Sequence, residues 1–131
     1  MLEKSTTFGG VSSNDIPGCK EFYEGALGLT VTEAMGGLDV ELPDGKRLFV
    51  YPKDDHTPAT YTFLNFQVDD IEAAVDELRA HGVNTKIYPD EDFPTDERGI
   101  ARGNGRGPDI AWFTDPVGNV IAVLADSQPA G

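Results

Sequence analysis

The clearest pattern in the chain is a strand-like stretch that runs directly into a helix-like stretch between residues 63 and 83. Its first six residues alternate loosely between apolar and polar side chains, which is typical of a β-strand. Asp69 or Asp70 then supplies a side-chain oxygen that can cap a helix. The apolar residues that follow have the helical spacing i, i+3, i+4 and i+7, and they are Ile71, Ala74, Val75 and Leu78. The pattern predicts an amphipathic helix that packs on a sheet and ends near Gly82.

A second copy of this pattern lies 55 residues upstream. The matching residues are Phe8 and Phe63, Asp15 and Asp70, and Ile16 and Ile71. The first helix ends at Gly28, one residue off the register of the repeat. Turn-forming sequences at 43–45 and 115–119 occur in both halves. An internal repeat of this kind predicts two copies of one unit, each with the order strand, helix, strand, strand, strand.

In the first module the patterns predict a helix at 16–27 and strands at 6–12, 29–33, 38–42 and 47–51. In the second they predict, besides the strand and helix already described, strands at 84–88, 110–114 and 120–124. The 131 residues are expected to form one domain. Its expected parts are module one at about 6–52, a linker at 53–60, module two at about 61–126, and a flexible tail at 127–131.

The composition excludes some classes of binding partner. The formal net charge of −13 argues against nucleic acid and against an anionic membrane surface, because both need a basic footprint. The same charge favours a cationic ligand or simply keeps the protein in solution. No stretch approaches the ~20 apolar residues of a membrane span, so no membrane partner is expected. Cys19 is the single cysteine, which fits a cytoplasmic location and a role as a buried small hydrophobe.

Three segments resemble a known family. The superfamily of vicinal oxygen chelate proteins has a segment "FYxxxLGL", and residues 22–29, Phe-Tyr-Glu-Gly-Ala-Leu-Gly-Leu, are similar to it. Residues 66–71 and 115–119 resemble sequences of the same superfamily. This superfamily includes glyoxalases, bleomycin resistance proteins and extradiol dioxygenases. The resemblance covers residues 6–126 and implies an α+β fold, with two βαβββ modules whose sheets curl around a shared cavity. It also implies a homodimer.

In enzymes of the superfamily, the cavity holds a divalent metal bound by His, Gln or Glu from the first and last strand of each module. The positions that match these ligands by the resemblance are Phe8, Phe49, Phe63 and Ala122. None of these side chains can bind such a cation, so neither a metal nor another cofactor is expected. An aromatic-lined cavity suits a planar organic ligand, but the same residues could also fill the cavity as core.

Further residues are candidates for lining that cavity. Trp112 is the only tryptophan, and strand alternation leaves open whether it faces the cavity. Tyr51 is placed to line the mouth or to brace it. The long segment 89–108 is expected to be either a disordered loop or a lid. As a lid, it would fold Phe93 over the cavity, and Arg98, Arg102 or Arg106 would offer a positive charge to an anionic ligand.

The remaining polar residues give little evidence of a function. Asp54-Asp55-His56 is interpreted as solvated loop charge, because adjacent loop residues rarely converge on one metal. His81 is expected to cap its helix, and neither histidine has an evident nucleophile as partner. The sequence therefore favours a metal-independent protein that binds a small organic, antibiotic-like molecule and is not an enzyme. Two alternatives stay open: a glyoxalase- or dioxygenase-like enzyme with a displaced metal, and a non-catalytic dimeric scaffold.

Overall fold

The computed structural model describes residues 1–127. The chain divides into two compact units, Met1–Thr57 and Pro58–Gly131. The tail expected at 127–131 lies outside the described residues except for Ser127, whose Oγ accepts a hydrogen bond from the Gly105 N–H (2.7 Å). Within residues 1–127 no helix is both long enough and apolar enough to cross a membrane.

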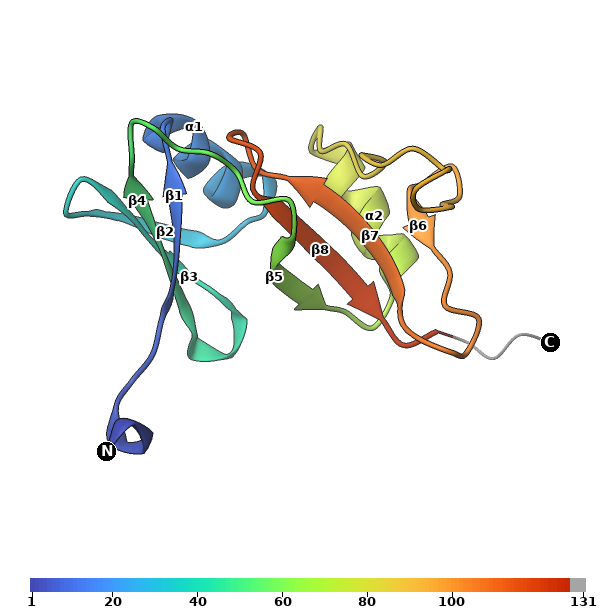
Figure 1. The fold of residues 1–131 in the computed structure, drawn as a ribbon, viewed down its shortest axis with the longest axis horizontal. Helices are drawn as coiled ribbons and strands as arrows, with labels where there is room; N and C mark the ends of the chain where they lie inside the picture. The colour runs from blue at the N-terminus through green and yellow to red at the C-terminus, as the bar shows by residue number, and fades with distance from the viewer. Residues whose placement is uncertain (128–131) are drawn as a thin grey trace. The chain divides into compact units, whose positions relative to one another are not determined.

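The first unit is a four-stranded mixed sheet with one helical segment (Figure 1). Its strands are β1 (Gly9–Ser13), β2 (Thr30–Ala34), β3 (Gly37–Glu41) and β4 (Arg47–Pro52). They lie in the order β1-β4-β3-β2, with β1 parallel to β4 and the other pairs antiparallel. Short 3-10 turns occupy η1 (Leu2–Lys4) and η3 (Pro43–Gly45). The helix α1 (Ile16–Glu21) packs against β3 and β4.

The helix expected at 16–27 is not a uniform α-helix. After α1 the chain widens into a π-helix, η2 (Phe22–Ala26), in which the Leu27 N–H donates to the Phe22 carbonyl (3.1 Å). A π-turn accommodates one more residue than an α-turn. This insertion accounts for Gly28, which ends the first helix one residue later than the repeat requires and adopts a φ of +70°.

The second unit repeats the topology (Figure 1). Its strands are β5 (Thr62–Gln67), β6 (Ile100–Ala101), β7 (Asp109–Thr114) and β8 (Val120–Ala125), in the order β5-β8-β7-β6. β5 is parallel to β8, and the remaining pairs are antiparallel. The helix α2 (Ile71–Ala80) lies behind β7 and β8. It buries Ile71, Val75 and Leu78, three of the four residues in the predicted apolar stripe.

The prediction of a strand at 84–88 is wrong, because side-chain hydrogen bonds hold this segment in another conformation. The Asn84 side chain accepts the Lys86 N–H (3.0 Å), which forms a local turn. Thr85 Oγ1 donates to the Arg98 carbonyl (2.6 Å). The fourth place in the sheet belongs instead to β6, which pairs with β7. The order strand, helix, strand, strand, strand is kept in both units, and the α+β class is confirmed.

Both helices begin at the aspartates that the repeat aligns. The Asp15 carboxylate accepts the Gly18 N–H (3.0 Å), and the Asp70 carboxylate accepts the Ala73 N–H (3.1 Å). Each satisfies a backbone donor that would otherwise have no partner in the first turn. Of the two candidates at the second helix, Asp70 is therefore the cap.

We expect Asp70→Ala to lower the free energy of unfolding by about 1 kcal/mol, the typical cost of losing an N-cap. Urea denaturation followed by circular dichroism measures this change. Asp69→Ala is the matched control, since Asp69 is exposed and makes no side-chain hydrogen bond within residues 1–127. Equal losses in both variants would show that general charge, and not the cap, sets the stability.

Candidate functional site

Strand alternation gives the first sheet two different faces. On β3 and β4 the fully or nearly fully buried side chains are Leu38, Val40, Leu48 and Val50, which lie on the side that α1 covers. The alternate residues Asp39, Arg47 and Phe49 therefore point to the opposite face. That face carries one aromatic side chain and one pair of opposite charges.

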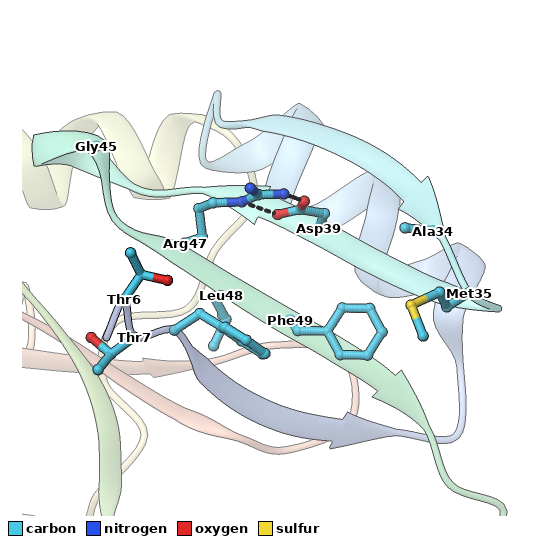
Figure 2. Close-up of a pocket in the computed structure, with 10 residues that line it drawn as sticks. Thr6, Thr7, Ala34, Met35, Asp39, Gly45, Arg47, Leu48 and Phe49 are labelled. Atoms are coloured by element: carbon cyan, nitrogen blue, oxygen red, sulfur yellow. Dashed lines mark hydrogen bonds and ion pairs between the residues drawn. The ribbon is translucent and has the colours of Figure 1, made fainter. Parts of the chain in front are cut away.

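A pocket of about 550 Å³ opens on this face, and we call it the aromatic pocket (Figure 2). Its lining comprises Thr6, Thr7, Phe8, Ala34, Met35, Asp39, Gly45, Arg47, Leu48 and Phe49. It therefore brings together Phe8 and Phe49, two of the residues expected to line a cavity. Phe8 is 71% exposed, so its ring is available to a ligand and does not fill a core.

A tight hairpin adds Met35 to the rim of the aromatic pocket. Met35 and Gly36 form the turn between β2 and β3, with φ values of +52° and +79°. Two consecutive positive φ values match the twist of the adjoining strands. The turn leaves the Met35 side chain 92% exposed, and Figure 2 shows it beside the ring of Phe49. A flexible thioether at this place can adapt to the shape of an aromatic ligand.

The polar part of the pocket is the ion pair between Asp39 and Arg47, drawn with dashed lines in Figure 2. Arg47 Nε donates to Asp39 Oδ1 (2.9 Å), and Arg47 Nη2 contacts Asp39 Oδ2. The two side chains are unequally accessible, since Asp39 is 20% exposed and Arg47 is 61% exposed. The carboxylate therefore holds the guanidinium in place, and the guanidinium is the charged group that solvent reaches.

A second opening adjoins the aromatic pocket, and we call it the polar hollow. Its volume is about 530 Å³, and its lining is Thr32, Asp39, Glu41, Leu42, Gly45, Lys46 and Arg47. Three residues, Asp39, Gly45 and Arg47, line both openings. The ion pair therefore stands where an apolar space meets a polar one.

Strand register tests whether the residues at the expected ligand positions occupy equivalent places. Gly10 pairs with Phe49 in the first sheet, and Asn65 pairs with Ala122 in the second. Gly10 lies two residues after Phe8, and Asn65 lies two residues after Phe63. Phe49 and Ala122 therefore occupy equivalent positions in the two sheets. Hydrocarbon side chains at all four positions supply no donor atom, so these residues do not fit a divalent metal.

The second unit gathers three aromatic side chains on its own sheet. Phe113 is fully buried on the face that α2 covers, so Trp112 points to the opposite face. Ring centroids lie 5.4 Å apart for Trp112 and Tyr88, and 5.0 Å apart for Trp112 and Phe93. Phe93 and Tyr88 also contact each other, at 5.0 Å. The segment 84–99 thus covers Trp112 with two of its own rings.

Two of the three arginines that were expected to serve an anionic ligand, Arg98 and Arg102, are engaged within the second unit. Arg98 Nε donates to Asp76 Oδ1 (2.8 Å) and holds the pKa of that carboxyl below its ordinary value. Arg102 contacts three carboxylates, those of Glu72, Asp96 and Asp109. Ile100, in the same segment, is fully buried. The segment is therefore anchored by ion pairs and by core packing, and Arg98 and Arg102 are occupied by carboxylates of their own unit.

The remaining candidates have local roles. Ala122 lies directly opposite Trp112 in the sheet, so these two residues are neighbours. Phe63 falls at an irregularity of the β5–β8 register. Tyr51 shares a face with Phe49 by alternation, and its ring lies over Gly10, where an added Cβ would be 3.7 Å from Tyr51 Cε1. Tyr51 is not among the residues that line the aromatic pocket.

The pattern along the chain gives no sign of the partner of His56. Ser12 Oγ lies 2.6 Å from His56 Nδ1. The two residues are 44 positions apart, and no local motif joins them, so only the fold could reveal the pair. The contact fastens the end of the first unit to β1. His81 behaves as expected, since its Nδ1 lies 2.9 Å from the Glu77 carbonyl at the end of α2.

The acidic linker residues do not form a metal cluster. Asp55 pairs with Lys53 (2.7 Å), which lowers the pKa of Asp55 through that hydrogen bond and ion pair. Within residues 1–127, no group of three or more His, Cys, Asp or Glu side chains is arranged to hold a metal ion. Cys19, as expected, is fully buried and lies 3.2 Å from Ser13 Oγ.

Comparison with known proteins assigns the family. Residues 8–123 match the model of the Glyoxalase/Bleomycin resistance protein/Dioxygenase superfamily. The chain belongs to this superfamily, as the resemblance of its motifs had indicated. A search of curated proteins found no match.

Solved structures share the fold. A glyoxalase family protein from Enterococcus faecalis aligns with a TM-score of 0.69 and 20% identity, covering 95% of this chain and 99% of that chain. The genomically encoded fosfomycin resistance protein FosX from Listeria monocytogenes has a TM-score of 0.69, 15% identity and 95% coverage of each chain. A glyoxalase/bleomycin resistance protein/dioxygenase from Nocardioides has a TM-score of 0.65 and 20% identity, covering 95% of this chain and 86% of that one. At these identities the likeness shows the fold alone.

We expect Phe93→Ala to uncover Trp112. The substitution removes one ring from the three-ring cluster, which should cost about 0.5–1.5 kcal/mol per lost aromatic pair. Acrylamide quenching of the single tryptophan should then become stronger, and its emission should shift to the red. Asp92→Ala, at the neighbouring exposed position, is the control and should change neither signal. Unchanged quenching in Phe93→Ala would contradict the packing of segment 84–99 on Trp112.

Proposed function

We propose that this protein binds a small planar organic molecule in the aromatic pocket, without a metal. One observation carries the proposal: two phenylalanines at the expected ligand positions, Phe8 and Phe49, line an open pocket of about 550 Å³. Pockets for small ligands commonly have volumes of 300–1,000 Å³ and are mostly apolar with few polar groups. The aromatic pocket has this character, since its only charged groups are the paired Asp39 and Arg47.

The superfamily supports a binding role without specifying the ligand. The superfamily takes part of its name from bleomycin resistance proteins, and FosX of Listeria monocytogenes is a fosfomycin resistance protein. An antibiotic-like ligand for this chain is accordingly part of the proposal. Metal-assisted chemistry is disfavoured by the residue types at the four ligand positions, which offer no oxygen, nitrogen or sulfur atom to a cation.

The first experiment combines elemental analysis with native mass spectrometry on protein purified without chelators. We expect no stoichiometric transition metal, and any co-purified organic adduct would give the mass of the ligand. One tightly bound metal per chain would overturn the metal-independent proposal. It would mean that residues other than those at the four expected positions hold the metal.

Binding itself can be tested with N-phenyl-1-naphthylamine, an uncharged fluorescent aromatic probe. We expect Phe49→Ala to weaken its affinity about tenfold, because aromatic contacts contribute about 0.5–1.5 kcal/mol beyond area burial. Phe8→Ala should weaken it as well. Tyr61→Ala is the matched control for Phe8→Ala, because Tyr61 is 70% exposed and does not line the pocket. If all three variants bind the probe as the unaltered protein does, the aromatic pocket is not the site.

A further inference from the structure

We propose that the ligand is an aromatic carboxylate, whose ring lies against Phe8 and Phe49 and whose carboxylate binds the free edge of Arg47. This inference rests on the proposed function, since it concerns the same pocket. It goes further by assigning the charge of the ligand and the residue that selects it.

The geometry of the ion pair leaves one edge of Arg47 free. A guanidinium carries five N–H donors in a rigid plane. Asp39 occupies the edge formed by Nε and Nη2, through its two carboxylate oxygens. Arg47 has no other polar partner within residues 1–127. The edge formed by Nη1 and the second proton of Nη2 is therefore available, and its spacing suits a carboxylate that accepts two parallel hydrogen bonds.

Asp39 positions Arg47 and is a poor partner for a cationic ligand. One of its oxygens accepts a hydrogen bond from Arg47 Nε, the other forms an ion pair with Arg47 Nη2, and its side chain is only 20% exposed. A ligand ammonium would have to compete with a bidentate pair that forms within the protein. A ligand carboxylate competes with nothing but water, because Arg47 is 61% exposed.

The net charge of −13 favours a cationic ligand, but only at long range. At physiological ionic strength, exposed charges are screened beyond about 8 Å. Selection at contact therefore depends on the groups that line the site. In the polar hollow these are Glu41 and Lys46, one of each sign, together with the Asp39–Arg47 pair. The lining is balanced in charge, and the oriented, accessible donor edge of Arg47 decides the preference.

The spacing of the residues along β4 matches the proposed ligand. Arg47 and Phe49 lie two residues apart on one face of the strand, which separates them by about 7 Å. Figure 2 shows the guanidinium of Arg47 and the ring of Phe49 on the same side of the sheet. A ligand that spans them needs a fused aromatic body with an acid group attached at its end.

The test is a set of three ligands with one aromatic body: 2-naphthoate, 2-naphthylmethanol and 2-naphthylmethylammonium. Isothermal titration calorimetry at neutral pH and physiological salt measures each affinity. We expect 2-naphthoate to bind about tenfold more tightly than the alcohol, because a charged bidentate pair adds to the same ring contacts. We expect the ammonium compound to bind no better than the alcohol. Tighter binding of the ammonium compound than of naphthoate would overturn the inference.

Two variants locate the preference. Arg47→Gln should reduce the naphthoate-to-alcohol ratio to about one, with binding of the alcohol retained. Lys46→Gln removes the same charge from the adjacent residue, so it controls for the change in net charge and should keep the ratio. If Lys46→Gln abolishes the ratio and Arg47→Gln keeps it, Arg47 is not the selecting residue. Retained binding of N-phenyl-1-naphthylamine verifies that each variant is folded.

Failure of the inference and failure of the proposed function give different results. If all three naphthyl ligands bind equally and Phe49→Ala weakens each of them, the pocket binds aromatic molecules without selecting charge, and only the inference fails. If none of the three binds, and N-phenyl-1-naphthylamine does not bind either, the proposed function fails with it.

Discussion

The packing of one helix against one face of each sheet determines where function can lie. In the first unit, α1 covers Leu38 and Val50, and the two-residue period of β3 and β4 then assigns Asp39 and Phe49 to the other face. A shift of register by one residue would bury the charges and expose the core, so the hydrophobic pattern strongly specifies this arrangement. The aromatic pocket is thus a direct consequence of how the core is built.

The two units share a topology but treat the face away from the helix differently. The first leaves Phe8 and Met35 exposed around an open pocket. The second covers Trp112 with Tyr88 and Phe93 from a segment that ion pairs and the buried Ile100 hold in place. The difference follows from the length of the connection between the helix and the next strand, which is residues 27–29 in the first unit and residues 81–99 in the second. Three residues are too few to reach over the sheet. A repeat in sequence has therefore produced one open face and one covered face.

Sequence reasoning recovered whatever depends on local pattern. It placed the helix caps, the repeat and the apolar stripe of α2, because spacing and side-chain chemistry determine these locally. It failed where distant residues decide. Segment 84–88 has the composition of a strand, but Thr85 and Lys86 bond to residues about ten positions further along. The Ser12–His56 contact spans 44 positions and has no local signal. The Asp39–Arg47 pair was missed because the order in which the strands align was not used to match their side chains.

Phe8 and Phe49 stand at positions that match metal ligands only by resemblance, and phenylalanine at such positions changes what a site can distinguish. A metal recognises paired oxygen atoms strongly, whereas an apolar pocket separates ligands of similar shape by only 1–3 kcal/mol. Rings alone would therefore make Phe8 and Phe49 tolerant of many aromatic compounds. Strong discrimination requires a polar group whose loss of a partner is costly. In the binding mode proposed above that polar group is Arg47, which forms an ion pair with Asp39 where the aromatic pocket meets the polar hollow.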